Sequence, residues 1–206
     1  EKWINQVLER NSTKICAHNQ ICLTKDEFNS LQDSCTYHME SPINHPHSIA
    51  IMRLSQCAST NVKVLLSGEG ADELFGGYVW QQPDNSTLDY WRRTQFLGQK
   101  ERKILELHTN FKSDHADERR RSFFNSLEGE NRILTYELGS HLHELLLRQD
   151  KMTMSASVEG RVPFLANDLI SYSYALRDSG RYNSDCPKRQ LKDILRSNGY
   201  GEDFVD

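Results

Sequence analysis

The sequence contains no hydrophobic run that approaches the roughly 18 apolar residues needed for a membrane-spanning helix. Its first residues, Glu1–Asn5, lack the basic segment and apolar stretch of a secretory signal. Asp and Glu number 29 against 25 Lys and Arg, and a net charge of −4 gives no electrostatic reason to bind nucleic acid or an anionic membrane. We therefore expect a cytoplasmic protein that binds neither nucleic acid nor a membrane.

Closely spaced metal ligands and cysteine pairs are also lacking. The five cysteines are scattered and none belongs to a C-x-x-C pair, so we expect free thiols rather than disulfides or a zinc site. The His-x-His pairs at 45–47 and 141–143 lack the i, i+4 spacing of helical metal ligands. We interpret them as surface histidines.

Hydrophobic residues are sparse, at 37% of 206 residues. A usual apolar share, glycine included, is about 45–50%. The length suits one domain of about 100–200 residues or one slightly larger unit. Because the chain is poor in apolar residues and begins without Met, we expect a piece of a longer protein. Exposed apolar residues should then mark the surface that packs against the remainder.

Helix and strand patterns are present in the first third of the chain. Apolar residues at 3, 4, 7 and 8 predict a short helix, and alternation over 14–23 predicts a strand. Thr24 and Glu27 form a capping-box pattern ahead of a second helix, whose apolar face carries Phe28, Leu31, Cys35 and Met39. A third helix is predicted over 46–58, and the apolar run Val62–Leu66 predicts a buried strand.

This succession of strand, helix, helix and strand favours an α/β fold with a parallel sheet and crossover helices. The rest of the chain reads as largely helical, with helices predicted over 130–147, 167–176 and 188–196. We therefore expect a mostly helical C-terminal half attached to a sheet begun earlier.

The segment Ser67–Tyr78 follows the predicted buried strand, and ligands bind at the carboxyl ends of such strands. Gly68 and Gly70 let the backbone turn sharply and approach a ligand. Three carboxylates, Glu69, Asp72 and Glu73, would repel bare phosphate but could attract an amine or a magnesium ion that carries phosphate oxygens. The alternative is an acidic turn that only complements a helix N-terminus.

The segment reads SGEGADELFGGY, and it resembles the signature SGEG[SA]DE[LV]FGGY of the synthetase domain of asparagine synthetases. Further stretches are similar to this family in the same order along the chain. They are YHMESP at 37–42, LRQDKMTM at 147–154, EGRVPFL at 159–165 and KDILR at 192–196.

The resemblance implies a parallel-sheet nucleotide-binding fold of the adenine nucleotide alpha hydrolase type. It also implies an ATP- and Mg²⁺-dependent carbon–nitrogen ligase. Such an enzyme adenylates a carboxylate, here aspartate, releases pyrophosphate, and uses ammonia from glutamine to form asparagine and AMP. The implied partners are aspartate and a glutaminase domain, and the longer protein is compatible with a homo-oligomer.

By position, the resemblance places Ser67, Gly68 and Gly70 against ATP. It places Glu69 beside the β-aspartyl-AMP intermediate, where a carboxylate can orient ammonia or take a proton from it. Asp72 would be a magnesium ligand.

Lys192 would stabilise negative charge as pyrophosphate leaves, with Lys188 as its nearest rival. Arg161 and Asp150 would assist the substrate or the phosphates, although a structural Arg–carboxylate pair is an equal alternative. Phe164, Leu165 and their neighbour Pro163 are interpreted as packing residues, and Met152 and Met154 as core.

Some family features are missing. Ala166 replaces the usual Asp after P-F-L, Glu40 and Ser41 replace Asp and Glu, and the S-G-G-x-D-S pyrophosphate loop does not occur. We therefore interpret residues 1–206 as a partial synthetase domain without its glutaminase domain, inactive in isolation. Two alternatives stay open: a related amide-forming enzyme with another acceptor (β-lactam, peptide cyclisation or sugar-acid amidation), and a non-catalytic remnant of the fold.

Overall fold

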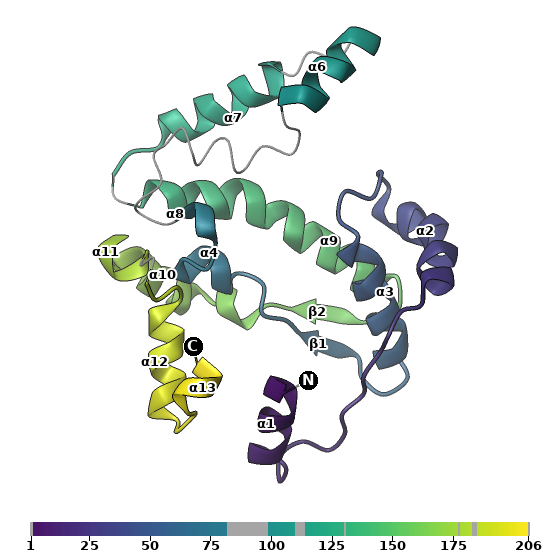
Figure 1. Cartoon of the computed structure of the whole chain (residues 1–206), viewed down its shortest axis with the longest axis vertical. Coiled ribbons are helices and arrows are strands. Elements are labelled where there is room, and N and C mark those ends of the chain that lie inside the picture. The colour runs from purple at the N-terminus through teal and green to yellow at the C-terminus, as the bar shows by residue number, and fades with distance from the viewer. Residues whose placement is uncertain are drawn as a thin grey trace. The chain divides into compact units, whose positions relative to one another are not determined.

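The computed structural model describes residues 2–81, 99–109, 114–129, 131–176, 178–182 and 185–205. These residues are mostly helical, and two short strands form a small parallel sheet. The α/β class is thereby confirmed in general, whereas the adenine nucleotide alpha hydrolase type stays a prediction. The chain divides into two compact units, whose elements are labelled in Figure 1.

The first unit comprises Glu1–Leu65, Arg148–Arg161 and Ile194–Asp206. Its elements are α1 (Lys2–Arg10), α2 (Lys25–Met39), α3 (His47–Ala58), most of β1 (Val64–Leu66), the end of α9 (Leu142–Met154), β2 (Glu159–Arg161), the end of α12 (Arg189–Ser197) and α13 (Glu202–Val205). The backbone N–H of Glu159 donates to the carbonyl of Lys63 at 2.9 Å, which ties the start of β2 to β1.

Helix α2 forms as its sequence predicts. The Thr24 side chain accepts the N–H of Glu27, and the Glu27 carboxylate accepts the N–H of Thr24 at 2.9 Å. The predicted apolar face then packs into a core with α3 and α9. Its fully buried members are Cys35, Ile49, Met52 and Met152, with Met39 beside them.

Two strand predictions in this unit need correction. Residues 15–24 have no regular structure, because no described strand lies beside them to accept their backbone hydrogen bonds. The run at 62–66 forms only the three-residue β1, and it is not buried, since the side chain of Leu66 is 70% exposed. Among the described residues β1 pairs with β2 alone, so one of its edges stays open.

The second unit comprises Leu66–Leu147 and Val162–Asp193. Its elements are α4 (Ala71–Phe75), a 3₁₀ turn (Val79–Gln81), α6 (Gln99–His108), α7 (Asp114–Ser126), α8 (Arg132–Tyr136), a π-helical turn (Glu137–His141), the start of α9, a 3₁₀ turn (Pro163–Leu165), α10 (Asn167–Ala175), α11 (Asp178–Arg181) and the start of α12.

Helix α4 lies in the core of this unit. Leu74, Phe75 and Leu134 are buried together, and partly buried residues of α10 and α12 pack against them. The hydroxyl of Ser173 in α10 donates to the carbonyl of Leu74 at 2.7 Å. The acidic loop is thus anchored through the helix that follows it.

The remaining helix predictions hold with changed bounds. Helical residues run without a break from Arg132 to Met154 through the π-helical turn, beyond the predicted end at 147. Helices α10 and α12 lie within one residue of the predicted 167–176 and 188–196. No described helix is both long and apolar enough to span a membrane. None of the five cysteines, all of which lie in the described ranges, forms a disulfide.

Candidate active site

The acidic loop turns sharply between β1 and α4. Gly70 starts α4 with φ of 93°, a conformation that favours glycine. A Cβ at Gly70 would also lie only 2.5 Å from Leu165. The P-F-L stretch therefore packs beneath the loop, which confirms that Phe164 and Leu165 are packing residues.

The loop backbone ahead of α4 is open. A Cβ on Gly68 would meet no atom within 4 Å. The N–H of Glu69 donates to the hydroxyl of Ser67 at 3.4 Å, and both side chains are half-buried. A ligand can thus approach the loop backbone closely at Gly68.

Asp72 forms an ion pair with Lys188, a residue distant in the sequence. The Lys188 Nζ lies 2.7 Å from Asp72 Oδ1, and their side chains are 34% and 35% exposed. Gly77 makes room for the pair, because a Cβ there would collide with the Asp72 carboxylate and the Lys188 Cε. Lys188 was the second choice after Lys192 on the family resemblance, and its only local signal in the sequence is its place in the lead-in to α12.

Glu73, beside Asp72, points into the unit instead of toward solvent. Its carboxylate is 1% exposed and accepts the Tyr78 hydroxyl at 2.8 Å. Burial raises the pKa of Glu73 above its ordinary value, the Tyr78 hydrogen bond opposes this, and nearby Asp72 and Glu69 add to it. Burial also raises the pKa of Tyr78, as does the Glu73 charge. Glu73 therefore stabilises the end of the loop and does not offer a charge to a ligand.

An aromatic cluster that was not predicted from the sequence follows the loop. The Tyr78 and Trp80 rings stack with centroids 4.4 Å apart, and His141 lies edge-on to both. Trp80 Nε1 donates to buried Glu137 at 3.0 Å. His141 and Glu137 belong to the π-helical turn, so the cluster ties the loop to the long helix. No spacing in the sequence links these residues.

The family model for asparagine synthase matches residues 1–198 of the chain. The chain belongs to the asparagine synthase family. Asparagine synthetase (glutamine-hydrolyzing) 1 of Bacillus subtilis is 25% identical over an alignment of 212 residues. The alignment covers 82% of this chain and 34% of the relative.

Asparagine synthetase (glutamine-hydrolyzing) 1 of Arabidopsis thaliana is 28% identical over 138 residues, covering 67% of this chain and 17% of the relative. A third relative is a Mycobacterium tuberculosis protein that is provisionally named as an asparagine synthetase (glutamine-hydrolyzing). It is 25% identical over an alignment of 218 residues, which covers 84% of this chain and 33% of the relative. The chain thus spans about a third of the length of the curated relatives that match most of it.

The other lysine suggested by the family resemblance, Lys192, lies one helical turn beyond Lys188. Its backbone N–H donates to the Lys188 carbonyl at 3.1 Å, and its side chain is half-buried. The structure therefore brings Asp72 and Lys188 into contact, with Lys192 next along α12.

Arg161 and Asp150 belong to the first unit. Arg161 Nε lies 2.9 Å from Glu159 Oε1 in an exposed pair on β2, and this pair lowers the pKa of Glu159. Arg161 thus pairs with a neighbour on its own strand, and both its substrate role and its structural alternative stay predictions. Asp150 is exposed on α9.

The methionines next to Asp150 differ. Met152 is fully buried in the core, as predicted, whereas Met154 is 54% exposed, so its core prediction was wrong. Two helical positions separate the residues, which turns Met154 away from the face that α2 and α3 cover.

The described residues of the second unit offer one carboxylate that a magnesium ion arriving with phosphates could use. Mg²⁺ is commonly held by one or two carboxylates together with phosphate oxygens and water. Asp72 offers a partly exposed carboxylate of this kind. No group of three or more His, Cys, Asp or Glu gathers within the described ranges, so an all-protein cage is not formed there. Asp72 is the residue that would hold the ion.

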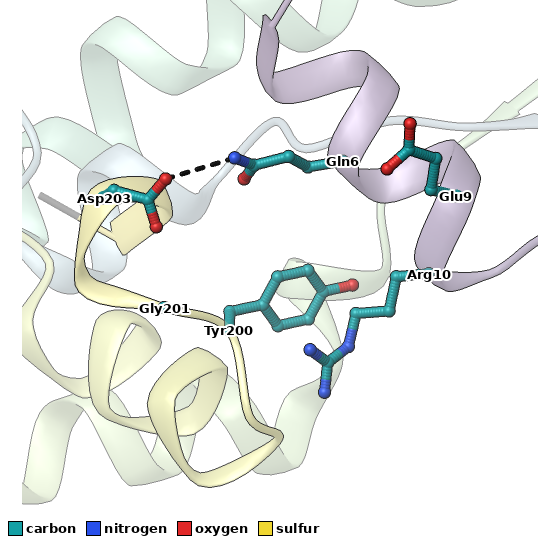
Figure 2. A pocket seen from close by; sticks show the side chains of 6 residues that line it. All are labelled: Gln6, Glu9, Arg10, Tyr200, Gly201 and Asp203. Carbon is teal, nitrogen blue, oxygen red and sulfur yellow. Dashed lines mark hydrogen bonds between the residues drawn. The ribbon is translucent and has the colours of Figure 1, made fainter.

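A separate cavity of about 410 Å³ lies in the first unit, between α1 and the segment around α13. Figure 2 shows its lining, with Gln6 donating to Asp203. The Arg10 guanidinium lies over the Tyr200 ring and donates to backbone carbonyls at 198 and 199. Arg10 thus links α1 to residues 198–200, which precede α13.

Proposed function

We propose that this chain carries part of the synthetase site of an ATP-dependent, amide-forming ligase. The reaction adenylates aspartate to β-aspartyl-AMP with release of pyrophosphate. Ammonia from glutamine then displaces AMP and gives asparagine. The observation that carries this proposal is the family match over residues 1–198, together with the open acidic loop at the end of β1.

The loop backbone would bind ATP. Gly68 leaves room for a close approach by the nucleotide, Gly70 sets the turn ahead of α4, and Ser67 would contact the nucleotide beside Gly68. Glu69 would stand beside the acyl-adenylate, where its carboxylate can orient ammonia and take up the proton that ammonia loses on attack.

Residues at the start of α4 and in α12 would offset the negative charge of the phosphates. Asp72 would hold Mg²⁺, which screens the polyphosphate when bound. Lys192 would stabilise the charge of the departing pyrophosphate from α12. Arg161 and Asp150 stay candidates for substrate contact.

The test is an ATP–pyrophosphate exchange assay with aspartate. Residues 1–206 alone should give no exchange, because the sequence lacks the S-G-G-x-D-S loop that grips pyrophosphate in this family. Robust exchange by this chain would contradict that expectation.

In a full-length protein containing this chain, exchange should depend on aspartate, and Glu69→Ala should block β-aspartyl-AMP formation or its capture by ammonia. Normal exchange together with normal ammonia-dependent turnover in Glu69→Ala would refute the role of Glu69.

A different acceptor carboxylate is the second candidate, favoured by Ala166 and Ser41 where the family has acidic residues. Comparing exchange among carboxylates in the longer protein separates the two candidates. A non-catalytic remnant of the fold predicts no exchange with any of them.

A further inference from the structure

We propose that Lys188 is a displaceable counter-ion of Asp72, which competes with a divalent metal for the same carboxylate. The inference rests on the proposed function in one respect, namely that Asp72 is where the metal binds. It adds an intrinsic competitor to that site: the metal must replace an ammonium group that the chain itself supplies.

The contact is built into the local backbone. Lys188 adopts φ of 56°, and its carbonyl accepts the N–H groups of Leu191 and Lys192 at the start of α12. Its side chain passes close to Gly77, where a Cβ would collide with both partners of the ion pair. The helix start and the glycine together place the ammonium group on Asp72.

The charges explain why a counter-ion is needed. Asp72 lies between Glu69 and Glu73 in the sequence, so the loop carries three carboxyl groups within five residues. Lys188 places a positive charge against Asp72 when no metal is present. The Lys188 pair uses only Oδ1 of Asp72, but a divalent cation on the same carboxylate would repel the ammonium group, so binding of one weakens binding of the other.

The lysine is able to leave. Both side chains are about one-third exposed, and lysine has a flexible four-carbon stem. Once displaced, the ammonium group would stay near the metal, where the phosphates of ATP provide negative charge. Binding of metal with nucleotide should therefore be favoured over binding of metal alone.

The test measures binding of Mn²⁺ alone to the 206-residue chain, by the EPR signal of free Mn²⁺ at low ionic strength. Lys188→Met should tighten binding about 2- to 5-fold, the range expected for removal of a partly exposed ion pair. The gain should shrink at high salt, because salt screens such pairs. Lys188→Asn provides a second variant, since asparagine tolerates the left-handed conformation at this position.

Arg189→Met is the matched control, because it removes one positive charge from the neighbouring residue, whose partner is Asp193. It should change Mn²⁺ affinity by less than half as much. Unchanged or weaker binding in both Lys188 variants overturns the inference, as does absence of Mn²⁺ binding in every variant. A gain that persists when Asp72→Asn is added also overturns it.

Asp72→Asn separates the inference from the proposed function. If Asp72→Asn leaves wild-type Mn²⁺ binding intact, the proposed metal role of Asp72 fails, and the counter-ion inference fails with it. If Asp72→Asn weakens binding while the Lys188 variants match the wild type, only the counter-ion inference fails.

Discussion

Ala166 occupies the N-cap position of α10. Its φ and ψ of −60° and 139° are the extended values of a helix N-cap, but no side chain accepts the first amide groups of the helix. An aspartate at this position, as in the family motif, would cap α10. The departure at Ala166 therefore affects the capping of α10 as well as the expectation about the acceptor substrate.

Ala166→Asp should stabilise the protein by about 1 kcal/mol, because a carboxylate at the N-cap accepts an otherwise unpaired helix amide. Urea unfolding at neutral pH measures the change. Ala166→Val, which adds volume without an oxygen, is the control and should give no gain. Equal stability of Ala166→Asp and the wild type would contradict the capping role.

At the scale of elements, the acidic loop depends on the turn at Gly70 and on the Leu165 side chain below it. Gly70→Ala should lower the free energy of unfolding by about 1–2 kcal/mol, which is the cost of a left-handed conformation for a residue with a Cβ. Gly68→Ala is the matched variant and should stay within about 0.5 kcal/mol of wild type. Chemical unfolding tests the pair, and equal losses would show that the turn at Gly70 is not a special constraint.

Helices α2 and α9 are joined by an ion pair in the first unit. Lys151 Nζ lies 2.7 Å from the carboxylate of Glu40, the residue that ends α2 with φ of 56°, and donates to the Met39 carbonyl at 2.8 Å. The hydrogen bond and charge of Lys151 hold the pKa of Glu40 below its ordinary value.

A lowered carboxyl pKa in the folded state adds stability above the ordinary pKa of glutamate, and this is lost as pH falls through the lowered value. Lys151→Met should therefore be less stable than wild type at neutral pH, with a smaller deficit at acidic pH. Thermal unfolding at both pH values measures this. In a Glu40→Gln background, the pH-dependent part of the deficit should disappear. A deficit equally large at acidic pH would contradict the linkage.

The helices of the first unit could be predicted because their signals are local. The capping box at Thr24 and Glu27 and the apolar face of α2 depend on residues within a few turns. The strand predicted over 14–23 failed because alternation describes a strand only where another strand pairs with it. The cluster around Tyr78, Trp80 and Glu137 could not be predicted from the sequence, because its members come from separate parts of the chain.

At the largest scale, several large apolar side chains among the described residues are exposed. Leu66 on β1 is 70% exposed, and Val79 beyond the acidic loop is 66% exposed. Because β1 has one unpaired edge within the described residues, an exposed apolar residue on it, such as Leu66, favours association with another chain.

Leu66→Lys should therefore reduce concentration-dependent self-association of the 206-residue chain, because a charged side chain discourages pairing at the edge of β1. Analytical ultracentrifugation measures the association. Leu107→Lys adds the same charge at an exposed leucine of helix α6 and should have less effect. If both substitutions act equally, net charge and not the strand edge controls association.

The family resemblance, the acidic loop and most helices could be predicted from the sequence alone, because a contiguous motif and helical periodicity depend on neighbouring residues. Three features could be seen only in the folded chain: the contact of Lys188 with Asp72, the inward turn of Glu73 to Tyr78, and the place of Ala166 at a helix N-cap. The reason is that an ion pair or a buried contact depends on which distant segments pack together. The same limit applies to β1, whose apolar run predicted burial while its exposure depends on the elements that cover it.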